Sequence, residues 1–195
     1  PDLNMGIWQN VFISACGPVV IRHPYVVTDL DLPSLDIAHL TVSAKLINKS
    51  AKPVKGKLKG EIENIRFEKE ISLMPGESKV IEFDPAAFKQ LNVNNPRIWW
   101  PHSVGAQELY NIKFTFETRG NISDEEIIRF GIREVSTYIN DEGWRGYKIN
   151  GKNILIRGGA WMTSDMLLRL TPERYESLIR YAREAGFNAL DRKSV

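Results

Sequence analysis

The side chains best suited to chemistry stand near the C-terminal end of the chain, where Trp161 and Asp165 follow a short apolar run. This run, residues 154–157, predicts a buried strand that is closed by Gly158 and Gly159. A carboxylate just beyond the C-terminal end of such a strand lies on the face where β/α proteins build their active sites. A packing role also fits the pattern, with Trp161 under the loop and Asp165 capping a turn.

Two further tryptophans, Trp99 and Trp100, are adjacent in the sequence. Aromatic faces suit carbohydrate rings, so the pair could form a sugar-stacking platform. Neighbouring residues of a strand point to opposite faces, however, so at most one of them can enter a core while the other covers an edge or an adjoining domain. Packing in the core or between domains is the interpretation that this geometry favours. Trp144 lies in a polar loop, and both roles remain open for it.

Other residue types offer little chemistry. The single Cys16 can form neither an internal disulfide nor a cysteine metal site. The acidic residues at 55–85 alternate with lysines, which is typical of the solvated face of a sheet. The histidines have no carboxylate or cysteine at ligand spacing, so neither a metal site nor a cofactor is expected; they are His23, His39 and His102.

Composition places the chain among ordinary globular proteins. Of its 195 residues, 43% are hydrophobic and 26% are charged, which is enough to bury a core in one or two domains. The net charge is only +2 and the basic residues are scattered, so nucleic acid is not an expected partner. No apolar run approaches the roughly 20 residues of a membrane-spanning helix, so no membrane partner is expected either.

Short β-rich runs separated by turn residues fill the chain from Val11 to about Tyr138. Period two dominates them: in residues 40–47 the even-numbered side chains are apolar and most odd-numbered ones are polar, as in an antiparallel strand with one buried side. Strands at this spacing predict a two-sheet sandwich of immunoglobulin type. The runs that we expect to be strands are 19–21, 40–47, 56–62, 79–83, 109–116 and 127–132.

The pattern changes after Tyr138. Residues 147–153 predict a hairpin, since the pair Asn150-Gly151 tolerates the positive φ of a tight turn. The strand at 154–157 follows, and residues 172–185 then predict an amphipathic helix that Thr171 caps and Gly186 ends. Strand, loop and helix in this order indicate the start of a β/α architecture.

Four segments stand in a specific order along the chain. They are DLNMGIWQ at 2–9, NPRIWWP at 95–101 followed by QELY at 107–110, FGIREV at 130–135, and INGKNILIRGGAW at 149–161 followed by SDMLLR at 164–169. Together they resemble glycoside hydrolase family 2, which includes β-galactosidases, and most closely its exo-β-glucosaminidases and plant-type endo-β-mannosidases.

The resemblance implies a mainly β chain cut from a larger protein. Residues 1–17 would be the end of an N-terminal jelly-roll sugar-binding domain with its linker, and residues 18–138 an immunoglobulin-like β-sandwich. Residues 139–195 would then begin a (β/α)₈ catalytic barrel, a TIM barrel, of which only the first β/α unit is present. This chain departs from the family pattern at residues 191–195, where Asp191 stands in place of the arginine that the family pattern has.

The resemblance also implies that the parent protein is a retaining hydrolase of β-linked glycosides. Such enzymes use two carboxylates about 5–5.5 Å apart, and the family supplies both from later barrel strands, so no catalytic residue is expected in this chain. Trp161 and Asp165 would form the rim of the subsite for the non-reducing sugar, the ring by stacking and the carboxylate by accepting hydroxyl hydrogen bonds. Arg169 is a further candidate there.

The expected partner is therefore an oligosaccharide or glycoside substrate of the parent enzyme, without a cofactor, and a periplasmic or secreted location is favoured. A carbohydrate-binding or dimerisation module without hydrolase activity is the alternative. The sugar, the linkage and the oligomeric state are left open by the sequence.

Overall fold

The computed structural model describes residues 10–162 and 171–192. Strands dominate this part of the chain, which confirms the prediction of a mainly β protein. The elements are β1 (Val19–Leu30), β2 (Ile37–Asn48), β3 (Val54–Ile62), β4 (Ile65–Leu73), β5 (Ser78–Phe83), the 3₁₀ turn η1 (Lys89–Leu91), β6 (Asn92–Asn94), β7 (Tyr110–Thr118), β8 (Asn121–Phe130), β9 (Val135–Ile139), β10 (Arg145–Ile149), β11 (Lys152–Ile154), β12 (Gly158–Trp161), α1 (Pro172–Glu184) and β13 (Ala189–Arg192).

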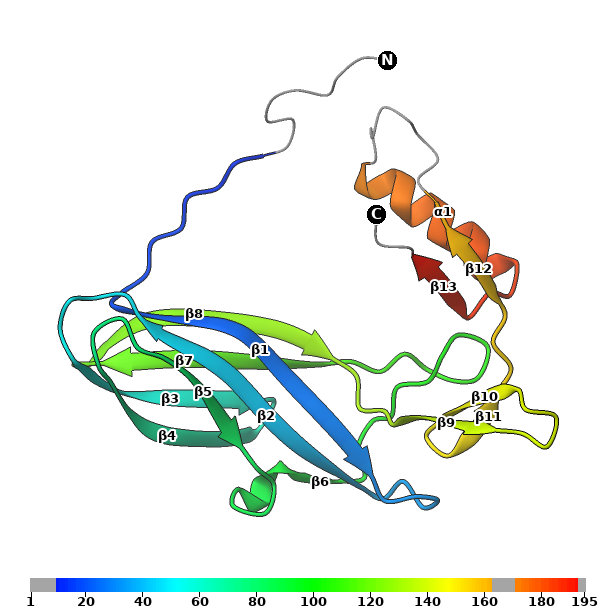
Figure 1. Cartoon of the computed structure of the whole chain (residues 1–195), viewed down its shortest axis with the longest axis horizontal. Coiled ribbons are helices and arrows are strands. Elements are labelled where there is room, and N and C mark those ends of the chain that lie inside the picture. Colours follow the sequence, from blue (N-terminus) through cyan, green and yellow to red (C-terminus); the bar gives the residue numbers. More distant parts are fainter. Residues whose placement is uncertain (1–9, 163–170, 193–195) are drawn as a thin grey trace.

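Two four-stranded antiparallel sheets form the larger part of the molecule and face each other as two layers (Figure 1). One has the order β1-β2-β5, with β6 also paired to β2, and the other has the order β4-β3-β7-β8. Both sheets contribute large, fully buried side chains to a single core between them. Its largest members are Phe83, Phe114, Phe116, Ile21, Leu40, Leu46, Leu58, Ile62, Leu73, Leu91, Ile112 and Ile132. The predicted β-sandwich is confirmed.

Strand β2 shows why alternation was a good guide. Leu40, Val42 and Leu46 are completely buried, whereas Thr41 and Ser43 are half-exposed on the other side. A strand whose successive side chains point to opposite faces buries one set and leaves the other to solvent, as the sequence predicted.

Strand β4 was missed by the sequence patterns. Its interior runs Glu68-Lys69-Glu70, three exposed charges in a row, which interrupts the alternation between buried Phe67 and buried Ile71. The strand lies at the edge of its sheet, where a core-facing lysine can still reach water and where charge discourages pairing with another chain. Position in the sheet therefore overrides the pattern that identifies central strands.

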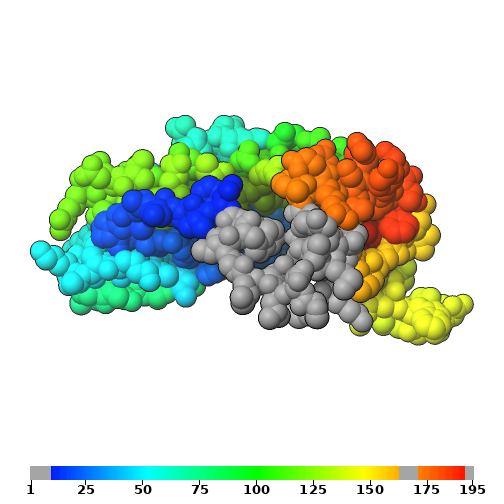
Figure 2. Space-filling model, turned by 90° about the horizontal axis from the view of Figure 1, so that it is seen from above, coloured from blue at the N-terminus to red at the C-terminus, as the bar shows by residue number. Residues whose placement is uncertain are grey.

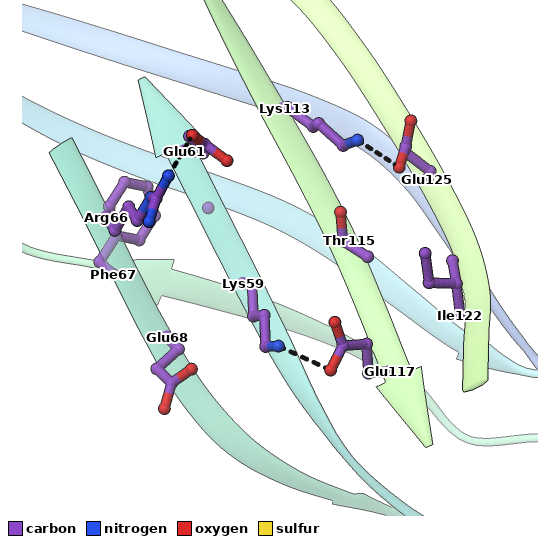
Figure 3. Close-up of a pocket in the computed structure, with 11 residues that line it drawn as sticks. Lys59, Glu61, Arg66, Phe67, Glu68, Lys113, Thr115, Glu117, Ile122 and Glu125 are labelled. Carbon is purple, nitrogen blue, oxygen red and sulfur yellow. Dashed lines mark hydrogen bonds and ion pairs between the residues drawn. The ribbon is translucent and has the colours of Figure 1, made fainter. Parts of the chain in front are cut away.

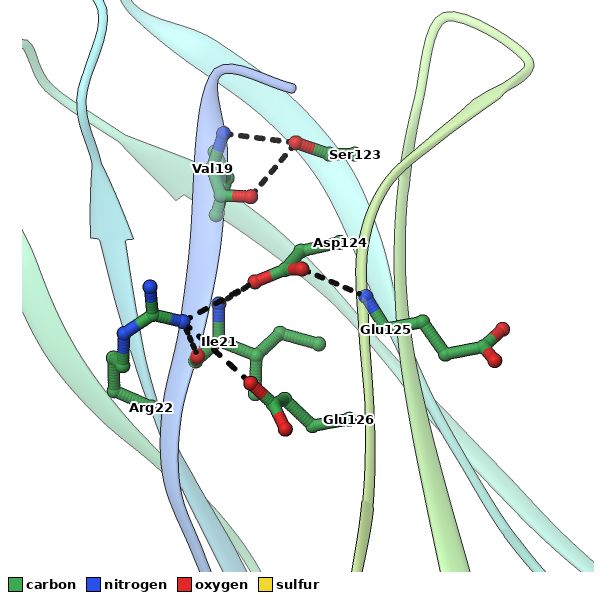
Figure 4. Close-up of polar contacts among 7 residues, drawn as sticks. All are labelled: Val19, Ile21, Arg22, Ser123, Asp124, Glu125 and Glu126. Carbon is green, nitrogen blue, oxygen red and sulfur yellow. Dashed lines mark hydrogen bonds and ion pairs between the residues drawn. The ribbon is translucent and has the colours of Figure 1, made fainter. Parts of the chain in front are cut away.

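The edges β1 and β8 of the two sheets lie alongside each other and are joined by side chains (Figure 4). Ser123 Oγ accepts a hydrogen bond from Val19 N at 2.8 Å and donates one to Val19 O at 2.7 Å. Asp124 accepts from Ile21 N at 2.8 Å, and Arg22 lies 3.6 Å from the same carboxylate. These contacts use backbone groups of β1 that would otherwise remain open at an edge.

Strands β9, β10 and β11 form a separate three-stranded antiparallel ribbon after the sandwich. The predicted hairpin at 147–153 is confirmed: Asn150 and Gly151 connect β10 to β11 with φ angles of 50° and 77°. Positive φ at both central residues is the geometry that suits the twist of two-residue hairpins.

The last elements form a strand–helix–strand unit in which β12 and β13 are parallel, with α1 between them in the sequence (Figure 1). The prediction of a strand at residues 154–157 was wrong by several positions, because β11 ends at Ile154 and β12 begins at Gly158. Two glycines would not be expected to start a strand, but β13 supplies the backbone partners that hold them extended. Off-pattern Asp191 lies within β13.

Helix α1 begins and ends where the sequence predicted. Thr171 Oγ1 accepts a hydrogen bond from Arg174 N, Pro172 occupies the first turn, and Gly186 follows the helix with a φ of 79°. A proline at the start and a glycine just past the end are the signals that fit helix termini. None of its side chains is fully buried.

Candidate functional site

Trp161 is the last residue of β12, at the carboxyl end of the strand. Its indole ring stacks on the phenol ring of Tyr175 in α1, with centroids 6.2 Å apart and planes 18° apart. The side chain is half-buried, so part of it remains accessible to a ligand. The strand, the helix and the stacking contact together fix the direction of this ring at the carboxyl edge of the β12–β13 pair.

The other two candidates from the sequence, Asp165 and Arg169, lie outside the described residues. A role for Trp161 and Asp165 in sugar binding therefore stays a prediction. Tyr175, whose ring stacks on that of Trp161, lies in the helix that the sequence predicted, but no local signal linked the two rings.

Strand β12 is held in place by contacts that allow no side chain at its first residue. A Cβ atom at Gly158 would lie 2.0 Å from the carbonyl oxygen of Ala189, so the two backbones approach each other closely at this point. Asn188 then bridges the chain before β12: its Oδ1 accepts from Arg157 N at 2.9 Å and its Nδ2 donates to Leu155 O at 2.9 Å. Asn188 is thus a positioning residue for the strand that ends in Trp161.

The ribbon is tied to the sandwich by Asn150, whose exposed fraction is only 3%. Its Nδ2 donates to Trp99 O at 3.0 Å, and its Oδ1 accepts from Glu134 N at 2.8 Å. Its own backbone N–H donates to Glu134 O at 2.9 Å. The turn residue predicted for its positive φ is therefore also the anchor of the hairpin, a role that the dipeptide pattern could not indicate.

Trp99 and Trp100 are both half-buried at this joint, and neither belongs to the fully buried core. The guanidinium of Arg133 lies 4.3 Å from the Trp99 ring centroid, and Lys152 Nζ lies 4.9 Å from that of Trp100. Cations over indole faces occupy surfaces that a sugar would need. The structure therefore favours the packing role, with the pair joining the sandwich to the segments that follow.

A shallow groove of about 490 Å³ lies on the outer face of the β4-β3-β7-β8 sheet (Figure 3). Its walls are charged side chains that pair across strands. Lys59 lies 2.6 Å from Glu117, Lys113 lies 2.6 Å from Glu125, and Arg66 lies 3.2 Å from Glu61. At one side, Lys57 donates to Glu68 at 2.7 Å.

This hydrogen bond lowers the pKa of Glu68 and raises the pKa of Lys57. A carboxylate held in its ionised form is the opposite of what a general acid requires. The sequence had assigned the acidic residues between 55 and 85 to solvation, and these exposed ion pairs confirm that reading for Glu61 and Glu68. The described side chains that line the groove form exposed ion pairs between neighbouring strands, and we assign them no catalytic role.

Within residues 10–162 and 171–192, no group of three or more histidine, cysteine, aspartate or glutamate side chains is placed to hold a metal ion. Cys16 is a free, exposed thiol. In the same part of the chain, no helix is long and apolar enough to cross a membrane.

The sequence profile described as glycosyl hydrolases family 2 matches residues 19–133, which is more than half of the chain and covers the sandwich. The chain belongs to this family. The predicted resemblance is therefore confirmed, and with it the assignment of the sandwich to a family of glycoside hydrolases.

Relatives within family 2 extend the likeness beyond the sandwich. An exo-β-D-glucosaminidase of Streptomyces avermitilis is 37% identical over 190 residues, which cover 97% of this chain and 21% of that protein. A mannosylglycoprotein endo-β-mannosidase of Lilium longiflorum is 32% identical over 201 residues, covering 97% of this chain and 20% of that protein. The chain thus spans about a fifth of the length of the curated relatives that it matches.

Among solved structures, the exo-chitosanase of Amycolatopsis orientalis superposes with a TM-score of 0.86 at 32% identity. The match covers 98% of this chain and 22% of the exo-chitosanase. A single-residue variant of that protein has also been solved in complex with PNP-β-D-glucosamine. The likeness therefore includes the ribbon and the strand–helix–strand unit as well as the sandwich.

Proposed function

We propose that this chain is the sandwich and the first β/α unit of a retaining glycoside hydrolase that acts on β-linked glycosides. The observation that carries the proposal is the 37% identity to an exo-β-D-glucosaminidase across 97% of the chain. β-Linked glucosamine is accordingly the first substrate to test, with mannose, galactose and glucuronic acid as the others.

In this proposal residues 1–17 end a preceding jelly-roll domain, residues 18–138 form the sandwich, and residues 139–195 begin a (β/α)₈ barrel. The parallel pair of β12 and β13 with α1 between them has the chain order of such a barrel's first unit. The two reacting carboxylates of a retaining enzyme would come from later strands of the barrel, so the chain alone would not hydrolyse a glycoside.

The chain would then act by positioning. A closed sandwich core gives a rigid base, Asn150 fixes the ribbon to it, and Asn188 fixes the segment before β12. Trp161 and Asp165 would lie at the rim of the sugar pocket, the ring against the sugar face and the carboxylate accepting from hydroxyl groups. A positioning error of about 1 Å can cost on the order of 10²-fold in rate, which gives these remote contacts their importance.

Release of nitrophenol from nitrophenyl β-D-glucosaminide and the corresponding mannoside, galactoside and glucuronide tests the proposal. The 195-residue chain should release none, whereas the protein of the full reading frame should turn over one of them. Robust turnover by the pure chain, or none of the four substrates accepted by the full-length protein, would overturn the proposal.

The role of Trp161 needs a variant of the full-length protein. Trp161→Ala should lower kcat/KM about fivefold, since one lost ring contact is worth roughly 1 kcal/mol. Tyr181→Ala is the matched control, because Tyr181 is an exposed aromatic residue on the neighbouring helix α1. Equal activity of the two variants would exclude Trp161 from the sugar pocket.

A further inference from the structure

The ribbon and the strand–helix–strand unit lie together at one end of the molecule, in yellow and in orange to red (Figure 2). A loop of the sandwich, residues 100–107, makes contact with both, and we name it the Ser103 loop. Trp100 N donates to Ala106 O at 2.8 Å, which closes the loop. A Cβ atom at Gly105 would lie 2.8 Å from Cγ of Trp100, so the indole ring packs directly on the loop backbone. The loop therefore has a defined shape of its own.

Ser103 stands in this loop with a backbone φ of 73°. The left-handed conformation is uncommon for residues other than glycine and persists where the surrounding structure determines it. In this conformation Ser103 Oγ accepts a hydrogen bond from Arg157 Nη2 at 3.2 Å. The same loop is in contact with β11, because Lys152 Nζ lies 4.9 Å from the ring centroid of Trp100. One loop of the sandwich thus touches both the ribbon and the segment that enters β12.

Arg157 is the point at which this loop meets the chain that follows α1. Its backbone N–H donates to Asn188 Oδ1 at 2.9 Å, and its carbonyl oxygen accepts from Asn188 N at 2.8 Å and from Ala189 N at 3.2 Å. Its guanidinium group lies close to the backbone of Gly186, where a Cβ atom would be 3.9 Å from Nη1. The backbone of Arg157 is therefore bound to the start of β13, while its side chain is bound to the sandwich.

The contacts of Arg157 bear on Trp161 because the two residues are the ends of one short extended segment. Trp161 is four residues further on, about 13 Å along a strand. Residues 158–161 pair with β13 throughout, so the strand is held straight between these two points. A shift at its entry is then passed on to the ring at its carboxyl end. An error of about 1 Å in the position of a substrate-binding group is enough to matter for function.

We propose that Arg157 is a positioning residue of the sugar pocket: it joins the Ser103 loop to β12 and so sets the place of the Trp161 ring. The sugar in this role rests on the proposed function of the chain, whereas the link between loop and strand rests on the contacts of Arg157. A ring that stacks on the sugar binds substrate and transition state alike. Loss of its correct position should therefore raise KM and leave kcat unchanged.

Hydrogen exchange of the amides at residues 159–161 in the 195-residue chain tests the link without a substrate. Ser103→Gly keeps the positive φ and removes the hydroxyl group, so exchange should accelerate about two- to threefold, a small change because both bonded side chains are exposed. Ser103→Asn also tolerates positive φ and offers an oxygen to Arg157, so it should restore most of the protection. In the Arg157→Ala background, Ser103→Gly should have no further effect, because the bond is already lost.

Kinetics of the full-length protein separate positioning from a loss of folded protein. Arg157→Ala should raise KM for the accepted nitrophenyl glycoside about threefold and leave kcat unchanged. Partial unfolding would instead lower the apparent kcat and leave KM as it is. Arg129→Ala is the matched control, since Arg129 is an exposed arginine of β8, and it should change neither parameter.

Three results would each overturn the inference: equal exchange in Ser103→Gly and Ser103→Asn, a full effect of Ser103→Gly in the Arg157→Ala background, or a lower kcat at unchanged KM in Arg157→Ala. Turnover of none of the four glycosides by the unmodified full-length protein would instead refute the proposed function. The exchange measurements need no turnover, so the two failures are distinguishable.

Discussion

The sandwich and the β12–α1–β13 unit achieve order in different ways. The sandwich closes two sheets over a common core in which three phenylalanines are completely buried, whereas α1 buries no side chain fully. The unit nevertheless has well-formed caps and a regular parallel pair. Local signals can thus specify the ends of a helix, while the burial that stabilises a fold must come from elements on both sides.

The consequence is that the two regions depend on different contacts. The sandwich is stabilised mainly by burial of apolar side chains, and the unit is held by a few polar and backbone contacts around Gly158 and Asn188. Substitutions should therefore separate the two regions by the size of their effects.

The largest expected effect is in the sandwich core. Phe114→Ala removes a fully buried ring from β7 and should lower the free energy of unfolding by about 3–5 kcal/mol, because it loses burial and leaves a cavity. Urea denaturation followed by fluorescence measures this. Leu178→Ala, at a half-buried position of the mostly exposed α1, is the comparison and should cost less than about 1 kcal/mol. Equal losses would mean that the unit has a core as tight as that of the sandwich.

The next effect concerns the backbone approach at the start of β12. Gly158→Ala places a Cβ atom 2.0 Å from the Ala189 carbonyl oxygen and should separate β12 from β13, at a local cost of about 2–3 kcal/mol. Hydrogen exchange of amides at residues 158–161 should accelerate about 30- to 150-fold, while the sandwich amides keep their rates.

Gly159→Ala is the matched control for this change. Its added Cβ atom would meet only a ring carbon of Phe187, at 3.9 Å, so exchange should stay close to that of the unmodified chain. Acceleration by Gly159→Ala as large as that by Gly158→Ala would contradict a steric cause.

A smaller effect is expected at the joint between the regions. Asn150→Gly keeps the positive φ of the turn but removes the side chain that bonds Trp99 O and Glu134 N, at a cost of about 1–2 kcal/mol for the buried groups left unpaired. Exchange at the Glu134 amide should rise accordingly. Asn121→Gly in the exposed β7–β8 hairpin should change its neighbours little. An unaltered Glu134 amide would show that Asn150 is only a turn residue.

Much of this arrangement could be predicted from local patterns. The alternation in β2, the paired positive φ angles at Asn150 and Gly151, and the caps of α1 each depend on neighbouring residues only. The sandwich and both ends of the helix followed from them. The expected role of Trp161 and Asp165 at the rim of a sugar pocket came from the family resemblance. Composition and residue spacing alone did not indicate a sugar as the ligand.

The features that were missed depend on residues far apart in the chain. Ser123 bonds Val19 across 104 positions, and β12 is extended because β13, about 30 positions later, pairs with it. The strand β4 tolerates a run of three charges because it is at an edge. In each case the tertiary neighbour decides the structure, and the local sequence does not name that neighbour.

The smallest expected effect is a pH dependence within the sandwich, at His39 of β2. Its Nδ1 lies 2.5 Å from Asn92 Oδ1, and its Nε2 lies 3.1 Å from Asp31 Oδ1. Asn92 Nδ2 donates to two carbonyl groups, so its Oδ1 acts as the acceptor toward the ring. Only a protonated imidazole can donate from both nitrogens, and the hydrogen bonds to Asn92 and then Asp31 raise the pKa of His39.

A raised folded-state pKa stabilises the protein fully below the unfolded value of about 6.5 and loses that contribution as pH rises through the folded value. The sandwich should therefore be slightly more stable at pH 5.5 than at pH 8.5 through this residue, by about 0.5 kcal/mol, because the groups are partly exposed. The difference in unfolding free energy between the unmodified chain and His39→Gln, measured at both pH values, isolates the effect. His102→Gln, in the loop after Pro101, is the control for the loss of a histidine as such. A larger stabilisation at pH 8.5 would reverse the sign and exclude the doubly donating ring, leaving His39 as an ordinary surface residue of the sheet.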